Sequence, residues 1–279
     1  MQRYGGQDWA RYWRSADAPI EAMHAHFERH VYHRHSHESY SLGVTESGAQ
    51  AFTCRGSAHT SAAGMVMAFN PDDPHDGHAG NAGGFTYRMV HIGPGLVASV
   101  LADITGRRAG LPLFADPVTA DAELARRVRA LHRGLLGGAP ALRCDELLTA
   151  AIGAAVRRAA VRASFPGTDG APAAAEAIAA RVRQLIRQRY TDDITAGDLA
   201  AAVGRSRFTV HRAFMSVYRM APSDYQRQLR LRAARALIAG GTPISEAAAQ
   251  AGFADQSHLT RWFARCYGVT PASYRGAGR

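Results

Sequence analysis

The strongest constraint on the fold is an internal repeat in the C-terminal part of the chain. When the sequence is shifted by 49 residues, six positions correspond in identity or chemical type, namely Ser206 with Asp255, Arg212 with Arg261, Phe214 with Phe263, Tyr218 with Tyr267, Pro222 with Pro271 and Tyr225 with Tyr274. A repeat of this kind indicates that one supersecondary unit occurs twice. We therefore expect this region to be built from two similar units.

Each copy has the pattern of a short helix, a glycine turn and a second helix. The expected helices cover 199–203 and 206–218 in the first copy, and 244–251 and 255–267 in the second. Gly204 and Gly252 follow the short helices, where glycine adopts the left-handed conformation at little cost. Ser206 and Asp255 are favourable N-caps, because their side-chain oxygens can accept from the first backbone amides of a helix. This order of elements is that of a helix-turn-helix motif.

The second helix of each copy is amphipathic. Its apolar residues fall three or four positions apart and form an inward stripe, made of Val210, Phe214 and Val217 in the first copy and of Leu259, Phe263 and Cys266 in the second. In helix-turn-helix proteins the opposite face of this helix enters the major groove. The outward residues are Phe208, His211, Arg212 and Met215 in the first copy, and Ser257, Thr260 and Arg261, flanked by Gln256 and His258, in the second.

The distribution of charge favours the same partner. Residues 176–279 contain 16 arginines and 7 acidic residues, a net charge of +9, whereas residues 1–175 contain 17 arginines and 16 acidic residues, a net charge of +1. Such asymmetry indicates a nucleic-acid partner for the C-terminal part. The alternative is an arginine-rich proteome in which the charge carries no functional information. A helix expected over 223–239 would hold the two units about 34 Å apart, one turn of DNA.

The N-terminal part, about 1–115, has the pattern of a β-rich domain. Apolar and polar residues alternate over 40–45 and 85–92, as in half-buried strands, and 65–69 is a short apolar run. Turns rich in glycine, asparagine and proline separate these segments. Several short strands with regular turns predict a sandwich or a barrel.

Two helices and a linker are expected between the β-rich part and the repeat. Apolar residues recur at helical spacing over 124–135 and over 147–156, and a Gly-Gly-Ala-Pro break over 137–140 separates them. The resulting helical hairpin could pack on the β-rich part or pair with another subunit. Residues 164–175 are rich in glycine, proline and alanine and lack periodicity, which is typical of an interdomain linker.

Histidines gather at two places in the N-terminal part. His33, His35 and His37 occupy alternate positions, which share one face of a strand, and His75 follows the Asn-Pro turn. Such a cluster resembles a metal site, since neutral imidazole is a common ligand of zinc and related divalent ions. The interior of the domain could also use Tyr40, Arg55, Phe69 and Arg88, and an arginine there would suit an anionic effector.

The stretch from Gly252 to Arg275, GFADQSHLTRWFARCYGVTPASYR, is similar over its whole length to the signature of the AraC/XylS family of bacterial transcription regulators. The resemblance implies that the first recognition helix places Phe208, Thr209, His211 and Arg212 in one groove. It also implies that the second helix places Gln256, Ser257, Thr260 and Arg261, with His258 at its flank, in the next groove.

The family also has a cupin-like sensor domain, which the N-terminal part resembles. The resemblance implies an α+β multidomain chain with a cupin-like β-barrel over 1–118, a helical hairpin over 119–163, a linker over 164–175 and a double helix-turn-helix domain over 176–279. His35-x-His37 is similar to the start of the cupin metal motif, and His75 loosely matches the second motif. The usual glutamate is replaced by Ser41. Two alternatives stay open: a divalent metal, zinc or similar, held by His35, His37 and His75, or histidines that only line an effector pocket with Tyr40, Arg55 and Arg88.

We therefore expect a regulator without enzymatic activity, which binds promoter DNA in response to a small effector and acts as a homodimer through the hairpin. The alternatives are a metal-dependent cupin enzyme fused to a DNA-binding domain and an architectural DNA binder with a vestigial sensor. The sequence contains no apolar stretch of the length of a membrane span and starts without the pattern of a signal peptide, so a cytoplasmic location without a membrane partner is expected.

Overall fold

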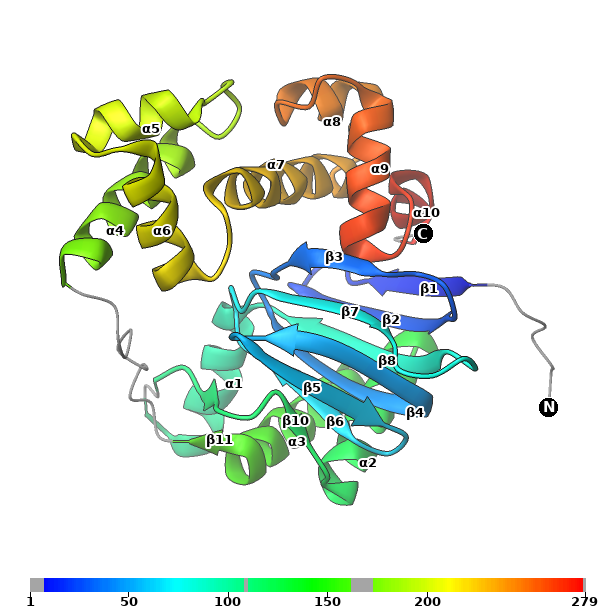
Figure 1. Ribbon diagram of the computed structural model, residues 1–279. Coiled ribbons are helices and arrows are strands. Elements are labelled where there is room, and N and C mark those ends of the chain that lie inside the picture. The colour runs from blue at the N-terminus through cyan, green and yellow to red at the C-terminus, as the bar shows by residue number, and fades with distance from the viewer. Residues whose placement is uncertain (1–7, 108–109, 162–172, 278–279) are drawn as a thin grey trace. The chain divides into compact units, whose positions relative to one another are not determined.

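The computed structural model describes residues 8–107, 110–161 and 173–277. The chain divides into two compact units, an N-terminal unit that extends to residue 165 and a C-terminal unit over 166–276 (Figure 1). The predicted linker, 164–175, falls for the most part outside the described residues, and its last three residues belong to the first helix of the C-terminal unit. Among the described helices, none is long and apolar enough to span a membrane.

Nine described strands of the N-terminal unit form two antiparallel layers that share one long strand, β4 (Tyr40–Cys54). The first layer has the order β1 (Trp9–Arg14), β2 (Ile20–Phe27), β8 (Phe85–Ile92), β4, β6 (Val66–Phe69) and β10 (Val118–Thr119). The second layer pairs β3 (Tyr32–His35) with β7 (His75–Ala79), and both β7 and β5 (Ser57–Ala62) with β4. The predicted strands over 40–45, 65–69 and 85–92 are confirmed.

The change of layer occurs in the middle of β4. Residues 40–48 pair with β8, residues 49–54 pair with β5, and the register with β8 shifts between Thr45 and Ser47. Gly48 follows this bulge with a φ of +71°, and a Cβ atom there would lie 2.0 Å from the carbonyl oxygen of Gly84. Glycine is required because both the left-handed backbone and the close approach exclude a side chain.

Side-chain alternation along the strands gives the sheet two apolar faces. The face between the two layers is rich in aromatic residues and includes Phe27, Tyr32, Phe52, Phe69, Phe85 and Tyr87. The other face carries aliphatic residues such as Leu42, Val44, Val90 and Ile92, which pack against helices. Two buried faces allow a domain of this size to bury a core on each side of one sheet.

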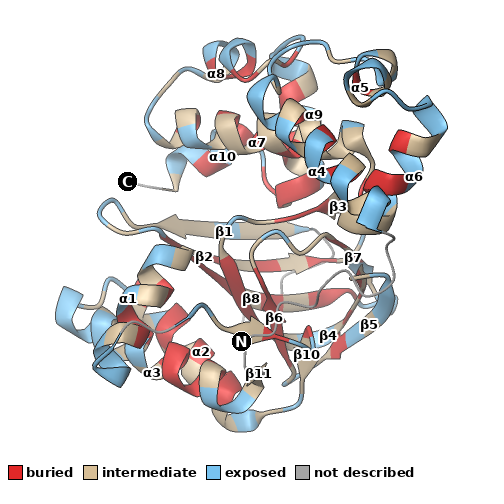
Figure 2. Ribbon diagram, turned by 90° about the vertical axis from the view of Figure 1, so that its left-hand side faces the viewer, coloured by how far each residue is buried: buried red, intermediate tan, exposed pale blue. Residues whose placement is uncertain are grey.

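Three helices cover the aliphatic face: α1 (Pro94–Thr105), α2 (Ala122–Leu136) and α3 (Ala141–Ala159). Figure 2 shows buried residues on α2 and α3 and on the strands beneath them. The predicted hairpin is therefore confirmed as α2 and α3, with the break at 137–140. The sequence interpretation lacks α1, although Pro94 at its first turn and the spacing of Val97, Val100 and Leu101 are helical signals.

A short ribbon lies at the end of the N-terminal unit. Strand β9 (Leu113–Phe114) pairs with β11 (Ala160–Val161), which directly follows α3. Residue 161 is the last described residue before the predicted linker. The segment that leaves this unit is thus hydrogen-bonded to the segment around Phe114.

The C-terminal unit is helical, and its elements are α4 (Ala173–Gln188), α5 (Ala196–Val203), α6 (Arg207–Tyr218), α7 (Pro222–Ala239), α8 (Ile244–Gln250), α9 (Gln256–Tyr267) and α10 (Pro271–Gly276). Helix α7 lies between a group formed by α4, α5 and α6 and a group formed by α8, α9 and α10 (Figure 1). With 18 residues, α7 is roughly 27 Å long. The 49-residue repeat is therefore a structural repeat, since α9 follows α6 by this spacing.

Both second helices begin at the predicted caps. The Ser206 hydroxyl oxygen accepts a hydrogen bond from the Thr209 amide at 3.1 Å, and an Asp255 carboxylate oxygen accepts one from the His258 amide at 2.6 Å. Gly204 has a φ of +60°, as expected after the short helix. Each such cap satisfies an amide that the helix itself leaves without a partner.

Candidate functional site

The nine side chains predicted to contact DNA lie on α6 and α9. On α6, Phe208, His211 and Arg212 are exposed and Thr209 is half-buried. The opposite side of α6 carries Val210 and Phe214, which are buried against α4 and α5. The amphipathic division predicted for the first copy is confirmed. This helix leaves one whole face to solvent.

Helix α9 has the same division. Gln256, Ser257 and Arg261 are exposed, and His258 and Thr260 are half-buried. Leu259, Phe263 and Cys266 form the buried side, as predicted. Arg212 and Arg261, which correspond under the repeat, are both exposed on the outward faces of their helices.

Three contacts orient the outward side chains and their neighbours. On α6, the Arg212 guanidinium lies 5.3 Å from the centre of the Phe208 ring. On α9, the Trp262 ring nitrogen donates a hydrogen bond of 3.0 Å to Nε2 of His258. The guanidinium of Arg227, from α7, lies 3.7 Å from the centre of the Trp262 ring. These cation–π contacts limit the rotamers of the arginines and of Trp262.

A second cluster of polar side chains lies in the N-terminal unit, between the two sheet layers. His35, His37 and His75 each offer one ring nitrogen, and these nitrogens all lie within 4.8 Å of one another. His35 and His75 are register partners on β3 and β7, and His37 follows β3. The sequence prediction that these three histidines come together is confirmed by their geometry.

His33 does not join this group. The register of β3 shifts between Tyr32 and His35, so that these two residues, three positions apart, are the buried ones. A bulge breaks the alternation on which the expectation for His33 rests. His78, further along β7, is exposed.

The buried rings of His35 and His75 are fixed by the backbone. Nδ1 of His35 lies 2.7 Å from the His33 carbonyl oxygen, and Nδ1 of His75 lies 2.8 Å from the Asp73 carbonyl oxygen. In each ring Nδ1 must donate, since a carbonyl only accepts, and in the neutral ring Nε2 keeps the lone pair. Burial, and then the neighbouring His75 ring, hold the pKa of His35 well below its usual value, and burial also lowers the pKa of His75.

A fourth histidine, which the sequence interpretation does not connect to the cluster, adjoins it. The ring centre of His91, on β8, lies 4.5 Å from that of His37. Nδ1 of His91 lies 2.8 Å from the hydroxyl oxygen of Ser41, its register partner on β4. Ser41, which stands where the cupin motif has glutamate, is thus within hydrogen-bond distance of His91.

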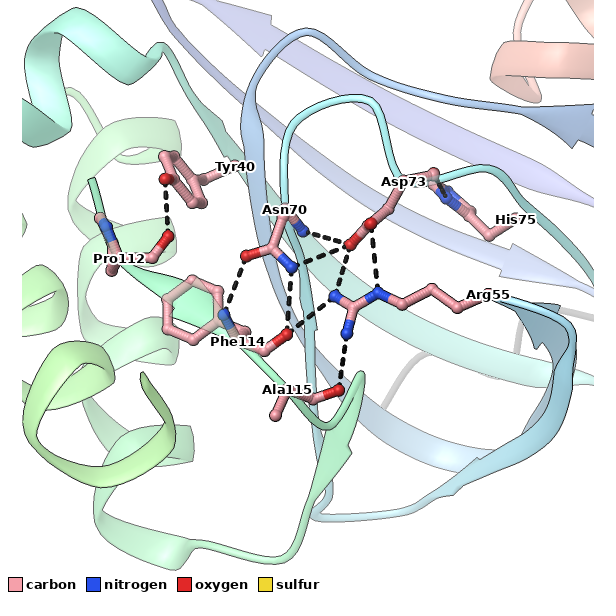
Figure 3. Close-up of polar contacts among 8 residues, drawn as sticks. All are labelled: Tyr40, Arg55, Asn70, Asp73, His75, Pro112, Phe114 and Ala115. Carbon is pink, nitrogen blue, oxygen red and sulfur yellow. Dashed lines mark hydrogen bonds and ion pairs between the residues drawn. The ribbon is translucent and has the colours of Figure 1, made fainter. Parts of the chain in front are cut away.

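Arg55 ties three segments of the N-terminal unit together. Its guanidinium makes two hydrogen bonds, of 3.1 and 2.6 Å, to the carboxylate of Asp73, and donates to the carbonyl oxygens of Phe114 and Ala115 (Figure 3). Asn70 donates to the same carboxylate and pairs with both backbone groups of Phe114. An anionic effector at Arg55 would have to compete with Asp73.

The remaining predicted pocket residues lie on the helix-covered face. Arg88 pairs with Glu46 at 2.9 Å and lies 3.2 Å from Nδ1 of His132 on α2. Tyr40 donates to the Pro112 carbonyl oxygen and borders a small apolar cavity between the sheet and helices α1 and α3, which Phe114 and Ile152 also line. The six predicted pocket residues therefore divide among three places, and the histidines alone form one compact group.

Comparison with known families assigns both units. The description "AraC-like ligand binding domain" matches residues 17–156, about half of the chain, and "Helix-turn-helix domain" matches residues 199–277. The chain belongs to the AraC family of transcription regulators. Its N-terminal unit is the ligand-binding domain of this family, and its C-terminal unit is the DNA-binding domain.

Relatives of this AraC-family chain agree with the assignment. The HTH-type transcriptional regulator YbfI of Bacillus subtilis (strain 168) is 26% identical over 225 residues, which cover 81% of this chain and 80% of the relative. Among solved structures, ToxT from Vibrio cholerae O395 is 11% identical and covers 97% of both chains with a TM-score of 0.55. ToxT from strain SCE256, bound to an unsaturated fatty acid, covers both chains fully at 10% identity and a TM-score of 0.54. At this identity, ToxT supports the fold alone.

Proposed function

We propose that α6 and α9 enter successive major grooves on one face of promoter DNA, and that their outward side chains read the base edges. The observation that carries this proposal is the matched exposure of the two helices. Positions related by the 49-residue repeat are exposed on both helices, among them Arg212 and Arg261, while the opposite faces are buried. An arginine in the major groove pairs bidentately with guanine.

The arrangement of the C-terminal unit supports this reading. Helix α7, roughly 27 Å long, joins the two helix-turn-helix groups, and successive major grooves on one face of DNA lie about 34 Å apart. The predicted contacts are Phe208, Thr209, His211 and Arg212 on α6 and Gln256, Ser257, His258, Thr260 and Arg261 on α9. The net charge of +9 on residues 176–279 supplies the general attraction to phosphates.

For the N-terminal unit we propose the role of effector sensor. Its membership in the ligand-binding family supports a small effector, and the fatty acid held by ToxT makes an apolar carboxylic acid one class to screen. We further propose that the chain acts as a dimer through the α2–α3 hairpin and has no enzymatic activity of its own. The relative YbfI, of which 80% is covered, is named an HTH-type transcriptional regulator, which supports the last point.

The groove assignment can be tested on DNA sites selected in vitro from random sequence with the full-length protein. Arg212→Ala and Arg261→Ala should each weaken binding to the selected site by about 1–3 kcal/mol and relax sequence preference at one position each. Arg187→Ala removes an exposed arginine of α4 and serves as the matched control. Unchanged footprints and preferences in both variants would show that α6 and α9 do not read the bases.

A further inference from the structure

We propose that His35, His37, His75 and His91 form a binding site for a divalent metal ion of the zinc type, and that this ion is the effector that regulates DNA binding. That the ion regulates DNA binding rests on the proposed function. That the four histidines bind an ion rests only on the geometry of the N-terminal unit.

The spacing of three rings, those of His35, His37 and His75, fits one ion, and the His91 ring adjoins them beside His37. Zinc–nitrogen bonds of about 2.0–2.1 Å in a tetrahedral site place the centres of two ligating rings roughly 5 Å apart. The measured distances between ring centres are 4.8 Å for His35 and His37, 4.5 Å for His35 and His75, 5.2 Å for His37 and His75, and 4.5 Å for His37 and His91. Three ring nitrogens already lie within 4.8 Å of one another. Because the ring centres already stand at this spacing, binding requires mainly a rotation of the rings that brings their nitrogens to about 3.3 Å from one another.

The surroundings of the rings are those of metal ligands. A ligating histidine commonly donates its other ring nitrogen to a backbone carbonyl or a polar side chain, which fixes its orientation. His35 and His75 make such bonds to the carbonyls of His33 and Asp73, and His91 is held by Ser41. For His91, Nε2 is therefore the nitrogen that a metal ion would take.

The character of the site favours zinc-like ions over calcium or magnesium. His35, His75 and His91 are 3%, 6% and 5% exposed, and the ring of Phe69 stacks on that of His75 with centres 4.2 Å apart. Nitrogen donors in a dry, aromatic setting suit zinc and its neighbours in the transition series, whereas calcium and magnesium require oxygen donors. With His91 as the fourth ligand, the donors are all neutral nitrogens.

A hydrogen-bond network connects this site to the end of the N-terminal unit. The Asp73 carbonyl holds His75, and the Asp73 carboxylate holds Arg55 and Asn70. Both of these side chains bind the backbone of Phe114 in β9, which pairs with β11 (Figure 3). A metal that repositions the His75 ring would therefore act on a continuous set of hydrogen bonds that ends at residue 161, the last described residue before the predicted linker.

The metal site can be tested on full-length protein stripped with a chelator and titrated with Co²⁺, whose visible absorption reports its coordination geometry. We expect one equivalent in a tetrahedral site, displaced by Zn²⁺. His37→Ala, at the least buried of the four rings, and His75→Gln should weaken binding by about 100-fold or more. His91→Ala should alter the Co²⁺ spectrum, and Ser41→Ala should weaken binding about 10-fold.

His78→Ala, an exposed histidine on the same strand as His75, is the matched control and should leave the titration unchanged. Far-UV circular dichroism separates loss of ligands from loss of folding. Absence of a saturable Co²⁺ spectrum in folded wild-type protein overturns the site. An unaltered spectrum in His91→Ala overturns the role of His91.

The regulatory half is tested by binding of the same preparations to an in vitro selected DNA site. Zn²⁺ should change the affinity of wild-type protein by about 10-fold, in the usual range of coupling between sites, and should leave His37→Ala unaffected. If metal binds and DNA affinity does not respond, the ion is not the effector. If no DNA is bound with or without metal while the Co²⁺ titration succeeds, the proposed function has failed and the metal site stands.

Discussion

At the scale of single residues, two phenylalanines on α6 have opposite roles. Phe208 is 67% exposed and Phe214 is fully buried, although they are six positions apart on one helix. Phe208→Ala should change the free energy of unfolding by less than about 0.5 kcal/mol, because the ring loses little burial on unfolding. It should still weaken DNA binding, since an exposed aromatic ring on a recognition helix can contact a thymine methyl group.

Phe214→Ala is the complementary variant and should cost about 3–5 kcal/mol of stability through the cavity that it leaves. Urea unfolding followed by circular dichroism, together with fluorescence anisotropy on labelled DNA, measures both quantities. If Phe208→Ala destabilised the protein as Phe214→Ala does, the face assignment of α6 would be incorrect.

His132 makes the stability of the N-terminal unit depend on pH. It is fully buried on α2, where it lies 3.0 Å from the Met23 carbonyl oxygen and 3.2 Å from a nitrogen of Arg88. Burial first, and Arg88 second, lower the pKa of His132 from 6.5 to about 4. Between these two values the unfolded chain binds a proton that the folded protein does not, so stability falls as the pH drops from about 6.5 to about 4.

The loss attributable to His132 amounts to roughly 3 kcal/mol over this window and none above it. Burial first, and Arg88 second, also lower the pKa of the neighbouring His24 to about 4, so His24 titrates over the same window, and Glu46 and Arg129 place charges nearby. His132→Gln should therefore flatten the dependence of unfolding free energy on pH between 6.5 and 4 by about one proton, as measured by urea unfolding at a series of pH values. An unchanged slope would show that His132 is protonated in the folded protein.

At the scale of elements, the N-caps of α6 and α9 set where the recognition helices begin. Ser206→Ala and Asp255→Ala should each cost about 1 kcal/mol of stability, because an amide of the first turn loses its partner. The first turn also carries Thr209 and His258, so DNA affinity should fall as well. The exchanges Ser206→Asp and Asp255→Ser should preserve both properties, since the repeat itself uses either residue at this position. Thermal unfolding and anisotropy distinguish these outcomes.

Replacing Arg55, in the turn between β4 and β5, tests how much the hydrogen bonds from this turn to β9 and the residue after it contribute to stability. Arg55 has a φ of +52° in the two-residue connection between these strands, a conformation that favours glycine. Arg55→Gly relieves this backbone while removing the bonds to Asp73, Phe114 and Ala115. A decrease of about 2 kcal/mol in the free energy of unfolding, measured in urea, would show that the side-chain hydrogen bonds outweigh the backbone strain. An increase in the free energy of unfolding would show the reverse.

Most elements that the sequence predicts have local signals, and most features that it misses depend on distant pairing; helix α1, which has local signals and is missed, is the exception. The caps, the glycine turn at 204, the amphipathic stripes and the hairpin break at 137–140 are local patterns, and all are found in the structure. The partnership of Ser41 and His91 depends on the register of two strands 50 residues apart, which alternation alone does not define. The bulge that turns His33 away is likewise a property of strand pairing.

The same limit explains the division of the predicted pocket. Tyr40 and Ser41 are neighbours in sequence, but their side chains lie on opposite faces of the sheet. The same holds for Arg88 and Met89. The sequence shows that the two side chains of each pair point to opposite faces of the sheet. It does not show which of these faces packs against the helices and which lies between the layers. That choice depends on the packing of α1, α2 and α3, and α1 is absent from the sequence interpretation.

At the scale of the whole molecule, the charge of the chain is concentrated in one unit. Residues 176–279 have a net charge of +9 and residues 1–175 a net charge of +1. Binding to DNA releases counterions in proportion to the phosphates that the protein contacts, so the logarithm of affinity falls linearly with the logarithm of salt concentration. If the C-terminal unit supplies the phosphate contacts, a fragment over 173–279 should show the same salt slope as the full chain, even where its affinity differs.

Anisotropy titrations between about 50 and 200 mM salt measure both slopes, and this range spans a large change in affinity for a protein with several phosphate contacts. Effectors that act through the N-terminal unit should then move the titration curves of the full chain without altering their slope, because the set of phosphate contacts belongs to the C-terminal unit. A smaller slope for the fragment would mean that the N-terminal unit, despite its near-neutral charge, contributes contacts of its own. The arginines exposed on α2, such as Arg126, would be the first to replace in that case.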